Sequence, residues 1–469
     1  MPRLVIAAIQ SGAGKTTVAT GLMAALSRNG MRVQPYKVGP DYIDPTYHTA
    51  ATGRISRNLD GWMCKPNLIR HLVARSAAGA DIALIEGVMG LFDGAGARSE
   101  EGSTAQMAKW LGAPVLLVVD AKGMARSVGA LLQGFTQFDP ALRIAGVIFN
   151  NVGSESHYRL LCEAVQSYAQ SVTPVGYLPK QGAIRAPERH LGLVPSYEQP
   201  QVAAYLDSLA TLIAQTVDIA AVIELARRHH QPLEAPDLAP GLGTQASAGA
   251  GVRIGIARDA AFHFYYEDGL DVLRNLGAEL VEFSPLRDRE LPPNLGALYF
   301  GGGFPEVYRK DLAENEGIRR AIRQAIGLGL PVYAECGGLM FLTQAIVDTD
   351  EIEWPMVGVL PVKARMQKRL ASLGYVTAAV QGETLLGGPG ETLRGHEFHW
   401  SVVDEHPPGW SPAYITTSRR AGTRPEGFVG SNLLASYVHV HFAANPRAAV
   451  RFVEAARAYA KVGEEATKE

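Results

Sequence analysis

The feature that most constrains the fold of this chain is a glycine-rich turn close to its N-terminus. Residues 4–9 form a short apolar run typical of a buried strand, and a helical pattern extends from Lys15 to Leu26. Between them, residues 10–17 read Gln-Ser-Gly-Ala-Gly-Lys-Thr-Thr. A strand, a glycine turn and a helix N-terminus in this order make a phosphate-binding P-loop. We therefore predict a nucleotide-binding α/β domain at the start of the chain.

The P-loop is the shortened G-x-G-K-[ST] variant, because Ile9 stands where the longer motif has a glycine. Lys15 would reach the terminal phosphates, and the Thr16 hydroxyl would help to hold Mg²⁺. A chance Lys-Thr pair after a glycine turn is the alternative, which the flanking strand and helix disfavour. Gln10 replaces the additional lysine of Min/Par-type positioning ATPases, which weakens a nucleotide-switch interpretation. The predicted nucleotide-binding residues are Gly12, Ala13, Gly14, Lys15, Thr16 and Thr17.

The chain is long enough for two domains, since its 469 residues exceed the roughly 250–300 at which single cores stop growing. Apolar runs alternate with helix-length segments in both halves, which predicts two doubly wound α/β domains. Residues 229–251 are rich in Pro, Gly, Ala and Gln, and are predicted to link a domain of residues 1–228 to one of residues 252–469. The predicted strands are residues 4–9, 33–38, 82–86, 115–120 and 144–149, and then 252–257, 279–283, 297–300, 331–334 and 433–440.

The composition excludes several classes of protein. A formal net charge of -2 gives no electrostatic case for binding nucleic acid or an anionic membrane, and no stretch of about 18 uncharged apolar residues could span a bilayer. Three cysteines without a CxxC pair suggest neither a disulfide framework nor a zinc site. We expect a cytoplasmic enzyme with small-molecule ligands. The sequence leaves its oligomeric state open, a homodimer included.

Acidic residues follow the predicted strand at residues 82–86. Glu86 ends this strand, at the edge of the sheet where α/β proteins bind ligands, and is predicted to bind Mg²⁺ or its water beside Thr16. A strand-end acid without a catalytic role is the alternative. Asp93, one loop further along, is a weaker catalytic candidate.

The loop after residues 33–38 combines charge with stiffness. Lys37, Asp41, Tyr42 and Asp44 are interspersed with a glycine and two prolines, which restrict the backbone and so aim the polar side chains. A plain turn would need none of these charges. We predict that Lys37 and Tyr42 contact phosphate or substrate, and that Asp41 or Asp44 binds metal or orients an acceptor carboxylate.

The second domain carries the pattern of a cysteine nucleophile. Cys336 follows a buried strand and precedes two glycines and a helix, an elbow that exposes the thiol, and the helix N-terminus is expected to lower the thiol pKa. Upstream, Gly302 and Gly303 lie in a glycine run that could present N–H groups to an oxyanion. A histidine base is required, and His439 and His441 stand two apart on one predicted strand, where they share a face.

Together these motifs resemble the cobyrinic acid a,c-diamide synthase family, whose members amidate two acetate side chains of a corrin-type macrocycle with ATP and glutamine. The resemblance implies an N-terminal domain similar to dethiobiotin synthetase, a C-terminal class I glutaminase domain, and ATP, L-glutamine and Mg²⁺ as co-substrates and cofactor. It spans nearly the whole chain. The motifs that carry it are residues 11–16, 37–45, 58–60, 86–94, 262–266, 301–303, 336–338 and 436–439.

The resemblance also implies roles for single residues. Asn150 would recognise adenine, and the family pattern Tyr-x-His favours His439 over His441 as the base. Ordinary class I glutaminases read His-x-Glu, whereas the third position is His441 here. The Cys336–His439 dyad is therefore expected to work without the usual orienting acid or to use another partner.

The implied reaction is phosphorylation of a substrate carboxylate by MgATP, followed by displacement of phosphate by ammonia that Cys336 and His439 release from glutamine. Ammonia is mostly protonated at neutral pH, so a protected route between the domains is expected. Hydrogenobyrinic acid and nickel-sirohydrochlorin a,c-diamide synthases share these motifs, and cobyric acid synthase amidates other positions of the ring. CTP synthase also joins a P-loop-like domain to a glutaminase but differs in both motifs. A nucleotide-switch scaffold with an inert glutaminase domain is the alternative from another class.

Overall fold

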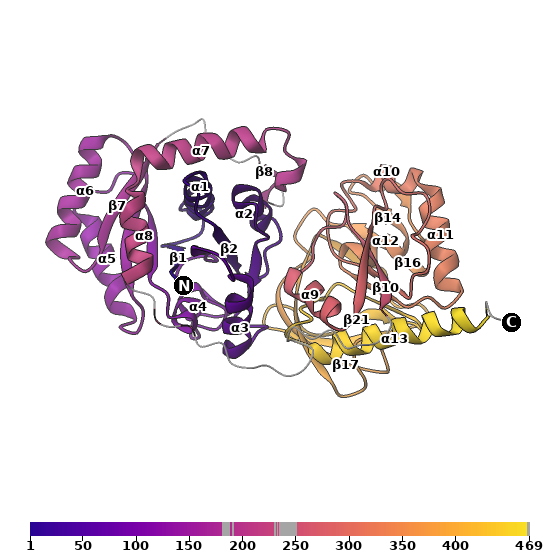
Figure 1. Ribbon diagram of the computed structural model, residues 1–469. Coiled ribbons are helices and arrows are strands. Elements are labelled where there is room, and N and C mark those ends of the chain that lie inside the picture. Colours follow the sequence, from indigo (N-terminus) through magenta and orange to yellow (C-terminus); the bar gives the residue numbers. More distant parts are fainter. Residues whose placement is uncertain (181–187, 190–191, 229–230, 232, 234–250, 467–469) are drawn as a thin grey trace. The chain divides into compact units, whose positions relative to one another are not determined.

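The computed structural model describes residues 1–180, 188–189, 192–228, 231, 233 and 251–466 (Figure 1). Most of the predicted linker, residues 229–251, lies outside the described part. The chain divides into two compact units, Met1–Asp237 and Leu238–Glu469. Within the described residues, no helix combines the length and apolar character needed to cross a membrane.

The first unit is built on a sheet of seven parallel strands in the order β3-β2-β4-β1-β5-β6-β7. Its strands are β1 (Arg3–Ala8), β2 (Val33–Val38), β3 (Arg57–Leu59), β4 (Ile82–Glu86), β5 (Val115–Asp120), β6 (Ile144–Val152) and β7 (Thr173–Pro179). Its helices are α1 (Lys15–Arg28), α2 (Asp44–Thr52), α3 (Pro66–Ser76), α4 (Thr104–Leu111), α5 (Ser127–Phe138), α6 (Glu155–Tyr168), α7 (Val202–Thr216) and α8 (Ile219–Arg228). A two-stranded sheet, β8 (Glu188–Arg189) and β9 (Gly192–Leu193), and a 3-10 helix, η1 (Ser196–Glu198), complete it. The prediction of a doubly wound parallel domain is confirmed.

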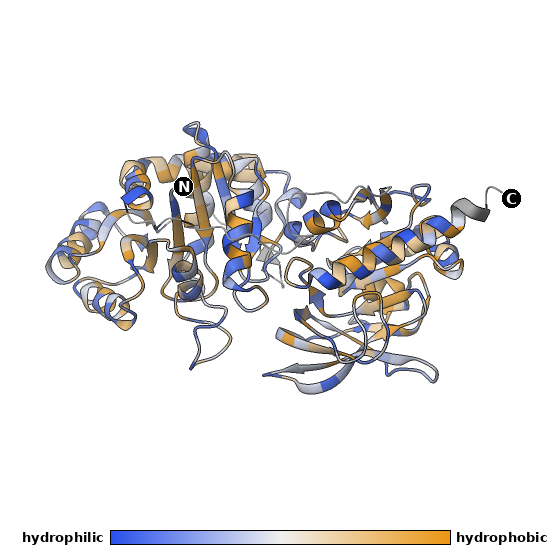
Figure 2. Ribbon diagram, turned by 60° about the horizontal axis from the view of Figure 1, so that its bottom comes forward, coloured by the Kyte–Doolittle hydropathy of each residue, from blue (hydrophilic) through white to orange (hydrophobic). Residues whose placement is uncertain are grey.

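Burial explains why these strands could be recognised in the sequence. Strands β1, β2 and β4 are buried along their whole length, because helices cover the sheet. Leu22 of α1, Ile213 of α7 and Val222 of α8 belong to one core cluster with the strands. Figure 2 shows the central strands of this unit as largely hydrophobic, flanked by helices that carry both hydrophobic and hydrophilic residues.

The second unit contains a ten-stranded mixed sheet in the order β11-β10-β12-β13-β22-β21-β20-β17-β18-β23. Its strands are β10 (Val252–Ala257), β11 (Ala278–Phe283), β12 (Ala297–Phe300), β13 (Val332–Glu335), β17 (Ser372–Val380), β18 (Thr392–His399), β20 (Ser411–Ser418), β21 (Gly422–Val429), β22 (Leu433–Ser436) and β23 (His439–Val440). A smaller sheet consists of β14 (Thr343–Val347), β15 (Glu353–Pro355), β16 (Leu360–Met366) and β19 (Ser401–Val403). The helices are α9 (Glu267–Asn275), α10 (Arg309–Glu314), α11 (Glu316–Gly327), α12 (Gly337–Leu342) and α13 (Pro446–Ala466). Strands β10 to β13 and β22 pair in parallel, as an α/β domain requires.

The single strand predicted at residues 433–440 is wrong. The segment forms two strands, and they pair with different neighbours: β22 lies beside β13, whereas β23 pairs with β18. The buried carboxylate of Glu426 accepts hydrogen bonds from the Ser436 hydroxyl and the Tyr437 backbone N–H, so the chain turns out of the first strand there. His439 and His441 therefore do not share the face of one continuous strand.

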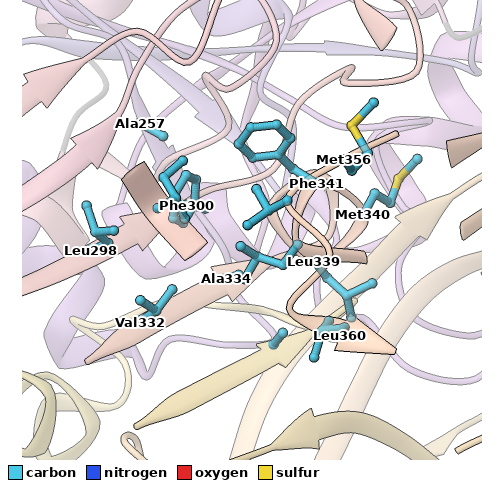
Figure 3. Packing of buried hydrophobic residues seen from close by; sticks show 14 of the residues in the cluster. Ala257, Leu298, Phe300, Val332, Ala334, Leu339, Met340, Phe341, Met356 and Leu360 are labelled. Atoms are coloured by element: carbon cyan, nitrogen blue, oxygen red, sulfur yellow. The ribbon is translucent and has the colours of Figure 1, made fainter. Parts of the chain in front are cut away.

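The core cluster of the second unit includes Cys336 of the predicted elbow. Figure 3 shows part of this cluster. Leu298 and Phe300 come from β12, Val332 and Ala334 from β13, and Phe341 from α12, and all five are buried in one cluster. The backbone of the elbow is therefore held in place by the packed side chains around it.

Candidate functional site

The P-loop connects β1 to α1 in the conformation that its glycines allow. Gly14 has φ 95°, and a Cβ atom there would lie 2.1 Å from Nδ2 of Asn150. The Asn150 side chain in turn donates a hydrogen bond of 3.0 Å to the carbonyl of Ala13. Asn150, predicted to recognise adenine, thus lies against the phosphate loop at the end of β6. Any residue other than glycine at position 14 would collide with it.

Lys15 begins α1 and points across the loop. Its ammonium donates to the carbonyl of Met89 at 2.9 Å. Burial, and then the charge of Lys37, lower the pKa of Lys15 to about 8. Negative phosphate oxygens at this position would favour the charged form again, because an opposite charge raises the pKa of an ammonium group.

Three strand ends bring charged groups together beside the P-loop. The parallel register pairs Glu86 of β4 with Ile6 of β1 and with Lys37 of β2. The Lys37 ammonium lies 2.8 Å from Oε1 of Glu86 and 2.5 Å from Oδ2 of Asp44. All three side chains are buried, so the group forms a shielded charge cluster. Thr16 joins it by donating a hydrogen bond of 2.7 Å to Glu86 Oε1.

The cluster shifts the pKa values of its members in opposite directions. Burial alone would raise the pKa of Glu86, but Lys37 and then His48 hold it well below its usual range. Burial and the charge of Asp41 raise the pKa of Asp44 well above its usual range, despite the opposing effect of Lys37. Burial alone would lower the pKa of Lys37, but the charges of Asp44 and Glu86 outweigh the effect of burial and raise this pKa. Strongly shifted groups at the edge of an α/β sheet are typical of a functional site.

His48 belongs to this cluster although the sequence analysis missed it. Its Nε2 lies 2.6 Å from Oε2 of Glu86, and its Nδ1 lies 3.3 Å from the hydroxyl of Ser56. His48 follows Asp44 by four residues on α2, so the two side chains share a face of the helix. That spacing was the available signal.

The remaining predicted residues of the first unit lie around the cluster. Asp41 accepts hydrogen bonds from the backbone N–H groups of Ile43 and Asp44 at 2.8 and 3.1 Å, and lies 3.8 Å from the Lys37 ammonium. Tyr42 is half-buried in the same loop. Asp93 is exposed and accepts a hydrogen bond of 3.0 Å from the N–H of Gly90, so it shapes its own turn.

The donor atoms at the cluster suit Mg²⁺. Magnesium binds oxygen ligands, usually one or two carboxylates together with substrate phosphates. The Thr16 hydroxyl lies 2.7 Å from Glu86 Oε1 and 3.4 Å from Asp44 Oδ2, so three oxygen ligands converge beside the P-loop. The Lys37 ammonium lies between the two carboxylates and already neutralises part of their charge.

In the second unit, Cys336 lies at a strained strand-to-helix turn. Its backbone has φ 47° and ψ −100°, a conformation rare for a residue with a side chain. The Cys336 N–H donates to the carbonyl of Ser436 at 2.7 Å, which extends the pairing of β13 with β22. The backbone has the geometry of the nucleophile elbow predicted from the sequence, but Cys336 is 5% exposed and belongs to the core cluster, so the prediction that the elbow exposes the thiol is wrong.

The predicted effect of the helix on the thiol is wrong. Burial, and then the charge of Glu306, raise the pKa of Cys336, and the hydrogen bond from the Gly337 N–H opposes them only in part. The helix that follows has six residues and the thiol is buried, so desolvation outweighs the helix N-terminus. A raised pKa means that the thiol holds its proton more tightly, so it requires a base before it can act as a nucleophile.

The glycine loop after β12 touches both the elbow and a histidine. A Cβ atom at Gly302 would lie 2.5 Å from Cε1 of His439, and a Cβ atom at Gly337 would lie 3.0 Å from the backbone nitrogen of Gly303. The glycine loop thus contacts the His439 ring through Gly302 and the elbow through Gly303. Cys336 directly follows β13, and His439 lies three residues after the end of β22, the strand that pairs in parallel with β13.

Two further histidines surround His439. His396 is its register partner on β18, and the two rings stack with centroids 4.7 Å apart. His441 instead packs on Tyr266 with centroids 4.6 Å apart, and burial lowers the pKa of His441 to about 4. The hydroxyl of Tyr266 also contacts Nδ1 of His396 at 3.0 Å. The structure therefore brings His439, rather than His441, to the glycine loop.

An acid that the sequence analysis overlooked lies close to the His439 ring. Oε2 of Glu335 is 3.7 Å from Nδ1 of His439, and both side chains are buried. Glu335 immediately precedes Cys336, and an acid at the buried end of a strand was the available signal.

Two family models match this chain. Residues 4–194 match the CobQ/CobB/MinD/ParA nucleotide binding domain, and residues 253–447 match the CobB/CobQ-like glutamine amidotransferase domain. The two matched segments correspond to the two compact units.

Full-length relatives carry both domains. The chain is 45% identical over 466 residues to cobyrinate a,c-diamide synthase of Priestia megaterium, with 98% of each chain covered. It is 43% identical over 463 residues to the cobyrinate a,c-diamide synthase of Dehalococcoides mccartyi, with 98% of this chain and 99% of that protein covered. It is also 46% identical over 488 residues to hydrogenobyrinate a,c-diamide synthase of Streptomyces coelicolor, with 97% of this chain and 98% of that protein covered.

Proposed function

Because the chain belongs to the cobyrinate a,c-diamide synthase family, we propose that it converts the a- and c-acetate carboxylates of cobyrinic acid to amides through acyl-phosphate intermediates. The enzyme is a glutamine-dependent amidating ligase of cobalamin biosynthesis, and ATP activates each carboxylate. The carboxylate oxygen is a poor leaving group, whereas phosphate leaves readily when ammonia attacks the acyl carbon.

The first unit performs the phosphoryl transfer. Residues 12–17 hold the nucleotide phosphates, and Lys15 and Lys37 neutralise the charge that develops during transfer. The oxygens of Thr16, Glu86 and Asp44 would hold Mg²⁺, which supplies electrostatic stabilisation of the phosphate oxygens when bound. Asp41 and Tyr42, on the loop between Lys37 and Asp44, are proposed to orient the acceptor carboxylate, and Asp93 is proposed as a further catalytic residue.

The second unit releases ammonia from glutamine. His439 takes the thiol proton of Cys336, and the sulfur attacks the side-chain amide carbon of glutamine. The N–H groups of Gly302 and Gly303 stabilise the oxyanion that forms. Collapse of this intermediate expels ammonia and leaves a thioester, which water hydrolyses to glutamate and the free thiol. The raised thiol pKa explains why a neighbouring base is needed.

One observation carries the proposal for the second unit. Gly302 contacts the ring of His439, and Gly303 contacts the elbow at Gly337. An inert glutaminase-like scaffold would have no need to keep a glycine loop free of side chains between a buried imidazole and a strained cysteine.

The test compares two nitrogen sources in a Cys336→Ala variant. We expect the variant to lose amidation with glutamine and to keep it with added ammonium, because the thiol acts only in ammonia release. Loss of both activities in a folded variant would contradict the division of labour between the units.

The macrocycle is tested by offering cobyrinate, hydrogenobyrinate and nickel-sirohydrochlorin side by side. We propose cobyrinate as the substrate, and the hydrogenobyrinate a,c-diamide synthase of Streptomyces coelicolor among the relatives makes the metal-free ring the second candidate. Preferential turnover of hydrogenobyrinate or nickel-sirohydrochlorin would replace cobyrinate in the proposal.

We further infer a cytoplasmic location, and a homodimer is the oligomeric state to be tested. All three cysteines are free, as expected in a reducing compartment. Sedimentation of the purified enzyme tests the dimer, and a monomer at working concentration would exclude it.

A further inference from the structure

Glu335 occupies a position that no glutaminase motif predicts. In ordinary class I glutaminases an acid two residues after the histidine orients the imidazole, and His441 stands there in this chain. Glu335 instead precedes the nucleophile itself, at the end of β13, and is 1% exposed. A buried carboxylate requires partners that compensate for its lost hydration.

The partners of Glu335 link the nucleophile to the histidine strand. Its Oε1 accepts hydrogen bonds from the backbone N–H of Val440 at 2.8 Å and from the hydroxyl of Tyr333 at 2.5 Å. Its Oε2 accepts a hydrogen bond from the hydroxyl of Tyr299 at 3.0 Å and lies 3.7 Å from Nδ1 of His439. One side chain therefore fixes the backbone next to His439 and faces its ring.

We propose that Glu335 is the positioning residue for His439, in place of the acid missing after the histidine. This inference rests on the proposed roles of Cys336 and His439. A carboxylate that faces Nδ1 favours the tautomer with the proton on Nδ1, which leaves Nε2 unprotonated to accept the thiol proton. The carboxylate also stabilises the imidazolium that forms.

The distance fits a resting state. A separation of 3.7 Å is too long for a hydrogen bond, but catalytic hydrogen bonds are often long without substrate and shorten in the substrate complex. The ring has little freedom to turn away, because His396 stacks on it and Gly302 contacts its Cε1 atom. A movement of less than about 1 Å would complete the bond.

Two other buried carboxylates in the vicinity are engaged elsewhere. Glu397 contacts Arg424 and the hydroxyl of Ser372, each at 2.5–2.7 Å. Glu426 accepts hydrogen bonds from the Ser436 hydroxyl and the Tyr437 N–H. Glu426 thus binds the chain before His439. Glu335 binds the backbone N–H directly after His439 and also faces its ring.

The experiment measures glutamine hydrolysis and ammonium-dependent amidation for E335Q and E335D. We expect E335Q to lower kcat for glutamine hydrolysis by about 10²-fold, with the KM for glutamine unchanged, because the general base is mispositioned while the glutamine site is intact. E335D should recover part of this loss, since it keeps the carboxylate. Ammonium-dependent amidation should be unaffected in both. Glu397→Gln, which changes a buried carboxylate that contacts Arg424 and Ser372 rather than the His439 ring, serves as the matched control and should keep kcat close to that of the wild type.

The outcomes separate this inference from the proposed function. If Cys336→Ala and His439→Ala abolish glutamine hydrolysis but E335Q keeps the wild-type kcat, the role of Glu335 is overturned. The proposed roles of Cys336 and His439 are then unaffected. E335D as impaired as E335Q, or loss of ammonium-dependent amidation in both variants, would assign Glu335 a purely structural role and also overturn it. Glutamine hydrolysis by Cys336→Ala would refute the proposed function itself.

Discussion

Substituting alanine for Gly302 tests the arrangement of the glutaminase site most sharply. The added Cβ atom would lie 2.5 Å from Cε1 of His439, whereas non-bonded carbon atoms approach to about 3.5–4.0 Å. The ring would therefore move by about 1 Å, and a misplacement of this size can reduce a rate by about 10²-fold. Alanine keeps the backbone N–H, so the proposed oxyanion donor is retained while the base is displaced.

The assay follows glutamine hydrolysis and ammonium-dependent amidation by the Gly302→Ala variant. We expect glutamine hydrolysis to fall by about 10²-fold and ammonium-dependent amidation to persist. Gly382→Ala is the matched control, because a Cβ atom at that glycine has no neighbour within 4 Å. Overpacking typically costs about 1–3 kcal/mol, so thermal melting must show that the variant is folded. A folded Gly302→Ala variant with wild-type glutamine hydrolysis would refute the role assigned to His439.

Three further predictions concern charge. Lys37→Met should abolish amidation with either nitrogen source and lower the free energy of unfolding by about 3–5 kcal/mol, because Asp44 and Glu86 lose their buried counter-charge. The control Lys109→Met, which breaks a more exposed ion pair, should lower it by about 1 kcal/mol or less. Equal losses of stability in the two variants would contradict this prediction. Burial, and then the charge of Glu397, raise the pKa of Glu426 to about 7. The Glu426 carboxyl therefore binds a proton more tightly in the folded protein than in the unfolded chain, and the free energy of unfolding falls as the pH rises from about 4.5 to 7. In Glu426→Gln, the free energy of unfolding measured with denaturant should fall by roughly 3 kcal/mol less over this pH range than in the wild type. The same pH dependence in both proteins would exclude the raised pKa of Glu426. Chelation of Mg²⁺ should stop ammonium-dependent amidation and added Mg²⁺ should restore it; full activity without divalent cations would remove Mg²⁺ from the proposal.

The sequence was most informative where a local pattern and a long-range requirement coincide. Strands buried on both faces are nearly continuous apolar runs, so β4 and β5 have the predicted bounds. The P-loop and the elbow at Cys336 could be located because each places glycines between a strand and a helix. The parallel pairing of β2 with β4 brings Lys37 and Glu86 together, a contact that the sequence did not predict.

What could not be predicted depends on packing between distant segments. The antiparallel strands β17, β18, β20 and β21 lie between residues 372 and 429, where no apolar run is long enough to identify them. The break between β22 and β23 follows from hydrogen bonds to Glu426 on another strand. The thiol pKa depends on how deeply Cys336 is buried, which its neighbours in sequence do not determine.

The central claim is that each carboxylate passes through an acyl phosphate before nitrogen is added. Cobyrinate labelled with ¹⁸O in its acetate carboxylates tests this claim most directly, with mass spectrometry of the phosphate released during amidation. The account predicts that each inorganic phosphate carries one ¹⁸O atom from the carboxylate. Phosphate without label, while the amide forms, would show that ATP does not activate the carboxylate in this way.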